Sequence, residues 1–268
     1  MHTDHTVLFE NLWQNYQNVT PSAAHIHRLL GAEEGRAIIN DHIALRTFNL
    51  APVGLDALAE HFLTLGYREG GEYHFKGKKL YARHYEHEDP KAPRVFISEL
   101  LTEQCSPELQ ALVNKLVKGI TKEQVHADTF LYSGRHWELD YDTYRELLKE
   151  SEYAAWLAAW GYRANHFTVS VNHLHNFETV ADINQLLKDN GFLVNGSGGE
   201  VKGSPDDLLE QSSTMADRVS VRFSDREMTI PSCYYEFARR YPTPGGTLYN
   251  GFVAASADKI FESTDTGM

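Results

Sequence analysis

The amino-acid sequence predicts an α+β protein in which two βαβββ modules form one curved mixed sheet around a central cleft. The main observation is an internal repeat, because DHIALRTFN followed by LDALAEHFLTLGY aligns with NHFTVSVNH followed by VADINQLLKDNGF. His42 and His166 stand at matching positions in the two copies, and Glu99 and Glu236 stand at matching positions in their closing strands. A chance likeness of two common strand–helix pairs is the alternative.

The first half of the chain contains the N-terminal helices and the first module. Apolar residues at helical spacing predict helices over residues 8–17 and before Gly31. DHIALRTF then predicts a strand, and residues 55–66 predict a helix that ends at a glycine. Three strand-like segments follow, GEYHFKG, KLYARHYE and PRVFISELL. We assign residues 1–40 to the N-terminal helices and 41–105 to the first module.

The second half begins with helices and repeats the module. Helical periodicity predicts one helix over 107–120 and a single long helix over 141–161. A strand over 165–171 and a helix near 178–190 follow, and after the turn NGSGG the strand candidates are RVSVRF and PSCYYEF. The chain is expected to be one domain, with a helical connection at 106–162, the second module at 163–240 and a C-terminal closing segment at 241–268.

Composition excludes several classes of protein. Two cysteines among 268 residues cannot form a disulfide framework, which favours a reducing, cytoplasmic location. With 37 acidic and 25 basic residues the net charge is −12, so binding to nucleic acid or to anionic lipid is not expected. The longest apolar run, from Tyr153 to Trp160, is far shorter than the ~20 residues that span a bilayer. No signal peptide is expected at the polar N-terminus.

Two histidines and one glutamate form the candidate metal site. Alternate residues of a strand share a face, so His42 and Arg46 point the same way, and His166 lies in the equivalent row of the second copy. If these faces pack inward with Glu236, two imidazoles and one carboxylate converge from three strands. This set suits non-haem Fe(II) and leaves positions for a chelating 2-oxo acid and O₂. The alternative is that the histidines are hydrogen-bonded core residues.

Arg46 is the candidate substrate-binding cation. It lies four residues beyond His42, about 13 Å along an extended strand, and its guanidinium can grip a carboxylate with two parallel hydrogen bonds. An arginine paired with a neighbouring acidic side chain for purely structural reasons is the alternative.

The motifs DHIALRTF, NHFTVSVN and YYEFARR followed by NGFVAASADKIFEST resemble the 2-oxoadipate dioxygenase/decarboxylase family, over roughly residues 8 to 265. The resemblance implies a vicinal-oxygen-chelate-like fold and a mechanism of the hydroxymandelate synthase type. It implies His42, His166 and Glu236 as Fe(II) ligands, with His42 and Arg46 also contacting the substrate and Arg46 acting in catalysis. It further implies that the segment around Ala255 and Ser256 closes on the substrate, although Ala255 stands where a larger aliphatic residue is expected.

The implied reaction converts a 2-oxo diacid such as 2-oxoadipate, with O₂, into CO₂ and a 2-hydroxy diacid such as 2-hydroxyglutarate, a step in lysine breakdown. Two other functions stay open. One is a metal-dependent lyase, isomerase or hydrolase that uses Zn²⁺, Mn²⁺ or Ni²⁺ on the same scaffold. The other is a non-catalytic module that only binds a ligand.

Three further groups are weaker candidates. Glu99 could be a fourth ligand, although a role behind the ligands or against the substrate is favoured. His173 and His175 form an HxH pair in a polar segment that is typical of a loop or a helix start. Cys233 is expected to be a buried strand residue rather than a nucleophile.

Overall fold

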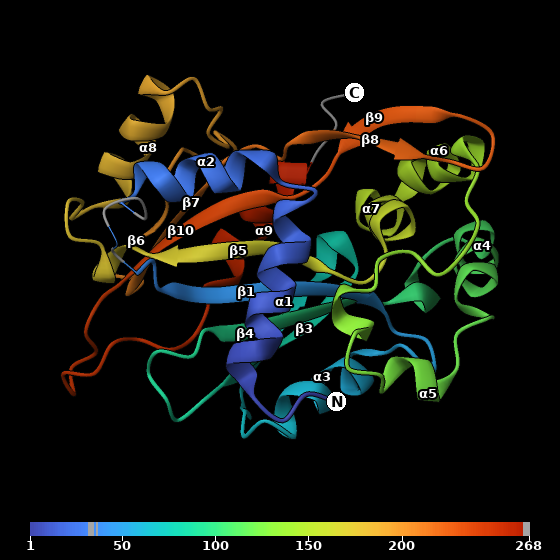
Figure 1. The fold of residues 1–268 in the computed structure, drawn as a ribbon, viewed down its shortest axis with the longest axis horizontal. Helices are drawn as coiled ribbons and strands as arrows, with labels where there is room; N and C mark the ends of the chain where they lie inside the picture. Colours follow the sequence, from blue (N-terminus) through green and yellow to red (C-terminus); the bar gives the residue numbers. More distant parts are fainter. Residues whose placement is uncertain (32–34, 36, 265–268) are drawn as a thin grey trace.

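An eight-stranded curled sheet forms the centre of the protein (Figure 1). The structure is a computed structural model that describes residues 1–31, 35 and 37–264. The strand order is β2-β3-β4-β1-β5-β10-β7-β6. The strands span Asn40–Phe48 (β1), Arg68–Phe75 (β2), Leu80–Glu86 (β3), Arg94–Leu100 (β4), Ala164–Ser170 (β5), Lys202–Ser204 (β6), Leu209–Ser213 (β7) and Tyr234–Arg240 (β10).

The sheet consists of two halves with the same topology. In the first half β1 pairs with β4 in parallel, and β3 and β2 follow as antiparallel neighbours. In the second half β5 pairs with β10 in parallel, and β7 and β6 follow in the same way. The two halves join through the antiparallel β1–β5 pair. The predicted α+β fold with two repeated modules is therefore confirmed.

Helices cover both faces of the sheet. Helices α1 and α2 cross one face, where α1 contacts β5 and α2 contacts β10 (Figure 1). Helix α9 lies against β2 at one edge of the sheet and against β6 and β7 at the other. The helices span His5–Gln17 (α1), Pro21–Leu29 (α2), Leu55–Leu63 (α3), Pro107–Val117 (α4), Lys122–Val125 (α5), Tyr141–Glu150 (α6), Glu152–Trp160 (α7), Val180–Asp189 (α8) and Ala254–Ile260 (α9). Among the described residues, no helix combines the length and the apolarity that crossing a bilayer requires.

The single long helix predicted over 141–161 is wrong, because two helices, α6 and α7, meet at Ser151. Ser151 has extended backbone angles, and its hydroxyl accepts a hydrogen bond from the backbone N–H of Ala154. This is the geometry of an N-terminal cap, which begins a new helix instead of continuing the previous one. The break allows α7, which is buried over residues 153–160, to turn away from the amphipathic α6.

The strand prediction for the second module also needs correction. Residues 218–222 form β8, which pairs with β9 (Glu227–Pro231) in a separate two-stranded ribbon outside the main sheet. The main sheet instead uses β6 and β7, which the sequence analysis missed. Strand β6 has only three residues, and β7 (LEQSS) places polar side chains in the interior, so neither shows the alternating apolar pattern of an ordinary strand.

Gly161 ends α7 in a conformation that requires glycine. Its φ is +66° and its ψ is −152°, and a Cβ atom there would lie 2.2 Å from the carbonyl oxygen of Gly134. We expect Gly161→Ala to lower the free energy of unfolding by at least about 2 kcal/mol, measured by chemical denaturation. Gly119→Ala is the matched control, because a Cβ atom there meets open space. Equal denaturation midpoints for the two variants would contradict this interpretation.

Candidate metal centre

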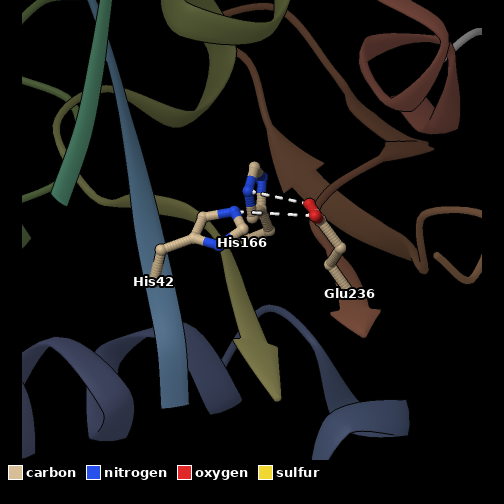
Figure 2. Close-up of side chains that lie close together, drawn as sticks. All are labelled: His42, His166 and Glu236. Atoms are coloured by element: carbon tan, nitrogen blue, oxygen red, sulfur yellow. Dashed lines mark ion pairs between the residues drawn. The ribbon is translucent and has the colours of Figure 1, made fainter. Parts of the chain in front are cut away.

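Three neighbouring strands bring together the two histidines and the glutamate that the sequence analysis selected. His42 lies on β1, His166 on β5 and Glu236 on β10, and their side chains point toward one another (Figure 2). One potential ligand atom from each residue lies within 4.8 Å of the other two. The strand pairing explains this convergence, since Thr168 on β5 pairs with both His42 and Glu236, and His166 lies two residues before Thr168 on the same face.

The three side chains are buried and in close contact. The Nε2 atom of His42 lies 3.5 Å from Oε1 of Glu236, and Nε2 of His166 lies 3.1 Å from Oε2. At most 5% of each residue is exposed. Two imidazole nitrogens and two carboxylate oxygens therefore face one small region of the interior.

Hydrogen bonds behind the histidines determine which ring nitrogens carry the protons. Nδ1 of His42 lies 2.8 Å from Oδ1 of Asp41, and Arg240 donates two hydrogen bonds, of 2.6 and 2.9 Å, to the same carboxylate. Against the desolvation that burial imposes, Arg240 and His42 hold the pKa of Asp41 far below its usual value, so this carboxylate only accepts. The proton of His42 therefore sits on Nδ1, and its Nε2 lone pair faces Glu236 and the hydroxyl of Thr168, which lies 3.0 Å away.

His166 has the equivalent arrangement. Its Nδ1 lies 3.1 Å from Oδ1 of Asn165, so we assign the proton to Nδ1 and the lone pair to Nε2. Its Nε2 lone pair then faces Oε2 of Glu236, which lies 3.1 Å away. In agreement with this, Oε2 of Glu236 is buried without a hydrogen-bond donor, despite its short distance to His166.

The pKa shifts at the site leave both imidazoles neutral, as metal ligands must be. Burial raises the pKa of Glu236 to about 8, and burial lowers the pKa of His42 and, more strongly, that of His166. Each shift shows that the protein interior alone does not stabilise charge at this position. A divalent cation would satisfy the two lone pairs and the carboxylate together. The donor set of two neutral imidazoles and one carboxylate fits such an ion.

Glu99 does not occupy the place equivalent to Glu236, which corrects the sequence-based alignment of the closing strands. On β4 the residue that pairs with Ala44, two positions after His42, is Phe96. On β10 the residue that pairs with Thr168, two positions after His166, is Glu236. Glu99 lies three residues beyond Phe96 and so belongs to the opposite face of the sheet, where its Oε2 accepts a hydrogen bond from the N–H of Leu55. The phenyl ring of Phe96 therefore occupies the position where a fourth metal ligand was considered.

The sequence analysis missed four residues that belong to the site, Asp41, Asn165, Gln211 and Arg240. Gln211 on β7 donates a 2.6 Å hydrogen bond from Nε2 to Oε1 of Glu236. Asp41 and Asn165 each directly precede a site histidine, and this shared pattern of a polar residue before histidine was the available signal. Arg240 and Gln211 gave no comparable signal, because their contacts depend on the pairing of distant strands.

We expect Asn165→Ala to weaken metal binding roughly 10- to 100-fold, because the ring of His166 loses the acceptor that orients it. The affinity is measured by titrating each protein with Co²⁺ and following the shift of its thermal unfolding midpoint. Asn184→Ala is the matched control, since Asn184 is equally buried but lies on α8 and is not among the residues around the site. Equal Co²⁺ affinity in the two variants would contradict an orienting role for Asn165.

Arg46 lies on the same strand as His42 and is 2% exposed. Its guanidinium carbon is 4.9 Å from the ring centres of both Tyr153 and Trp156. It donates hydrogen bonds to Oγ1 of Thr264 at 3.2 Å and to Oε1 of Glu152 at 3.5 Å, whereas its Nε has no partner. Arg46 is thus a buried cation held mainly by aromatic rings, with donor capacity left unused.

The C-terminal segment closes the space in front of the triad. The cavity there has a volume of about 20 Å³ and includes Phe252, Ala257, Ile260 and Phe261 in its wall. Of the two residues predicted for this segment, Ser256 is buried on α9 whereas Ala255 is exposed. The space holds roughly one water molecule, so a larger ligand requires movement of this wall. The last four residues of the predicted closing segment lie outside the described residues.

The remaining histidine and cysteine candidates lie elsewhere. His173 and His175 are exposed, and Nδ1 of His173 contacts Oγ of Ser170 at 2.8 Å. Cys233 is fully buried, its Sγ lies 3.5 Å from the carbonyl oxygen of Ala164, and burial raises the pKa of its thiol to about 12. A thiol in this state is a poor nucleophile.

Comparison with known sequences identifies a family to which this chain is similar. The profile of the 2-oxoadipate dioxygenase/decarboxylase family matches residues 4–246 of this chain. A curated relative from Oryza sativa subsp. japonica, named 2-oxoadipate dioxygenase/decarboxylase, chloroplastic/amyloplastic, is 37% identical over 96% of this chain and 78% of its own length.

Solved structures show the same fold. The hydroxyglutarate synthase of Oryza sativa, in complex with 2-oxoadipate, matches with a TM-score of 0.92 and 35% identity, covering 97% of this chain and 92% of that one. A Shewanella frigidimarina protein provisionally named a hydrolase matches with a TM-score of 0.91 and 62% identity, covering 95% and 100%. A glyoxalase-superfamily protein from Ralstonia eutropha, 24% identical with a TM-score of 0.74 over 93% and 86%, shares the fold. The predicted fold is thereby confirmed.

Proposed function

This chain belongs to the 2-oxoadipate dioxygenase/decarboxylase family, and from that premise we propose that it is an Fe(II)-dependent enzyme acting on a 2-oxo diacid. The proposed reaction converts 2-oxoadipate and O₂ into 2-hydroxyglutarate and CO₂. One oxygen atom of O₂ enters the carboxylate formed from the 2-oxo carbon, and the other becomes the hydroxyl group on the neighbouring carbon. The CO₂ leaves with the two oxygen atoms of the original carboxylate, so the reaction needs no second organic substrate.

The observation that carries the proposal is the buried triad of His42, His166 and Glu236, in which both imidazoles turn Nε2 toward the glutamate and Oε2 of Glu236 has no hydrogen-bond partner. These three residues would hold the metal. When bound, Fe(II) supplies the redox chemistry with O₂ and a chelation site for the 2-oxo acid. The complex of the rice relative with 2-oxoadipate supports the choice of substrate.

The chain's own residues orient the reactants and exclude water. Asp41 and Asn165 hold the two imidazoles so that their Nε2 lone pairs face the metal position. Gln211 orients the carboxylate of Glu236 through its Nε2 donor. Phe96 and Phe252 form apolar walls that keep bulk water away from the reacting atoms. Arg46 would bind the distal carboxylate of the substrate.

The test is anaerobic loading of the purified protein with Fe(II) and ascorbate, followed by addition of 2-oxoadipate and O₂. We expect equal amounts of O₂ consumed, CO₂ released and 2-hydroxyglutarate formed. Turnover without O₂, supported by Zn²⁺, Mn²⁺ or Ni²⁺, would replace this function with a lyase, isomerase or hydrolase. Failure to bind any divalent metal would leave only a ligand-binding module.

A further inference from the structure

Three buried polar atoms without hydrogen-bond partners belong to residues that line the small cavity at the triad. They are Oε2 of Glu236, Oε1 of Gln211 and the hydroxyl of Tyr234. The metal accounts for the first, and Gln211 already uses its amide nitrogen to bind Glu236. The phenol of Tyr234 has no role in the proposed metal centre, and it is fully buried. Burying a hydroxyl without a hydrogen-bond partner costs free energy, unless a bound ligand supplies the partner.

The position of Tyr234 is fixed by its surroundings. It lies two residues before Glu236 on β10, so both side chains share the inner face of the strand. Its ring stacks on the imidazole of His166, with centroids 4.7 Å apart and planes 27° apart. On the backbone side, the hydroxyl of Tyr16 donates a 2.5 Å hydrogen bond to the carbonyl oxygen of Tyr234. Both the ring and the backbone are therefore held in place.

Strand pairing places Tyr234 between the metal position and Arg46. The row that contains His42, Thr168 and Glu236 crosses the sheet at the triad. The next row contains Ala44 of β1, His166 of β5 and Tyr234 of β10. One further step of two residues along β1, about 7 Å, leads to Arg46.

Arg46 is also linked to the start of β10. Its guanidinium packs on the ring of Trp156, whose indole N–H donates to the carbonyl oxygen of Ser232, two residues before Tyr234. The row of Ala44, His166 and Tyr234 therefore lies between the triad and Arg46, and the charge of Arg46 acts on the phenol of Tyr234.

We propose that the hydroxyl of Tyr234 donates a hydrogen bond to the distal carboxylate of the 2-oxo diacid, beside Arg46, and thereby selects diacids over 2-oxo monoacids. This inference rests on the proposed function, because it takes the substrate to be chelated at the triad through its 2-oxo acid end. A phenol is a neutral donor, so it adds a directional contact without adding a second charge that would need compensation. The methylene groups of the substrate cannot accept a hydrogen bond, so they do not account for a hydroxyl at this position.

The test uses Tyr234→Phe, which removes only the hydroxyl and keeps the ring stacked on His166. Binding is measured anaerobically on the Fe(II)-loaded protein, with 2-oxoadipate and with 2-oxohexanoate, which has the same chain length but no distal carboxylate. We expect binding of 2-oxoadipate to weaken roughly 10- to 100-fold and binding of 2-oxohexanoate to stay within about twofold. Metal affinity and the thermal midpoint of the ligand-free protein should not fall.

Tyr235→Phe is the matched control. Tyr235 is the adjacent, equally buried tyrosine on the opposite face, and its hydroxyl contacts Nδ1 of His27 at 3.3 Å. This variant should bind both acids as the parent does. Equal weakening of both acids by Tyr234→Phe would overturn the assignment to the distal carboxylate. A lower thermal midpoint with unchanged binding would show that the hydroxyl is structural and would also overturn it.

The outcomes separate this inference from the proposed function. If the parent binds 2-oxoadipate selectively through Tyr234 but does not consume O₂, the proposed reaction fails and the contact stands. If the parent turns over and Tyr234→Phe keeps its preference for the diacid, the contact fails and the reaction stands. Absence of 2-oxoadipate binding in the parent would overturn both.

Discussion

Replacing Glu236 by glutamine should abolish metal binding and lower turnover at least about 10³-fold. The substitution preserves the shape of the side chain but removes the single anionic ligand of the triad, and two neutral imidazoles alone hold a divalent cation weakly. Because burial raises the pKa of Glu236 to about 8, the metal-free protein gains little from this carboxylate. We therefore expect the metal-free Glu236→Gln protein to be at least as stable as the parent.

The decisive measurement is the stabilisation that metal adds. A ligand present at 100 times its dissociation constant stabilises the folded state by about 2.7 kcal/mol, and this increment should be present in the parent and absent from Glu236→Gln. Glu99→Gln is the matched control, because Glu99 lies on the opposite face of the sheet against the N-terminus of α3. It should keep both metal-induced stabilisation and turnover. If Glu236→Gln still responds to metal, the triad is not the metal site.

Much of this site could be predicted from the sequence because strand alternation is a local rule. The spacing of His42 and Arg46 on one strand, and the repeat that relates His42 to His166, need only the two-residue period of a β-strand. The same rule placed Glu236 on an inward face. What it could not supply was the register between strands, which is why Glu99 was aligned with Glu236 although Phe96 holds that place.

Contacts between distant segments were not predictable in the same way. Asp41 and Arg240 are 199 residues apart and meet only because both halves of the sheet close around one interior. Gln211 lies on a short polar strand that follows a turn, so its sequence resembles a loop. Strands that line the site carry polar side chains on their inner face. A search for alternating apolar residues misses such strands.

Arg46→Lys should reduce kcat/KM for 2-oxoadipate about 100-fold while leaving metal affinity unchanged. The guanidinium lies among the rings of Tyr153 and Trp156, which fix its plane, and its Nε is free to donate. Lysine keeps the positive charge but presents a single point donor, so it cannot form two parallel hydrogen bonds to a carboxylate. Each lost charge-assisted hydrogen bond is worth about 1.5–3 kcal/mol, which corresponds to the expected factor.

The competing explanation is that Arg46 is a structural partner of Glu152. Their contact is long, at 3.5 Å, and the side chain of Glu152 is 29% exposed, so this ion pair should contribute little. Glu152→Gln separates the two explanations: steady-state kinetics should match the parent if Arg46 serves the substrate. If Glu152→Gln instead lowers kcat/KM and stability as much as Arg46→Lys does, the arginine acts through the fold, and the distal carboxylate must be bound by another group.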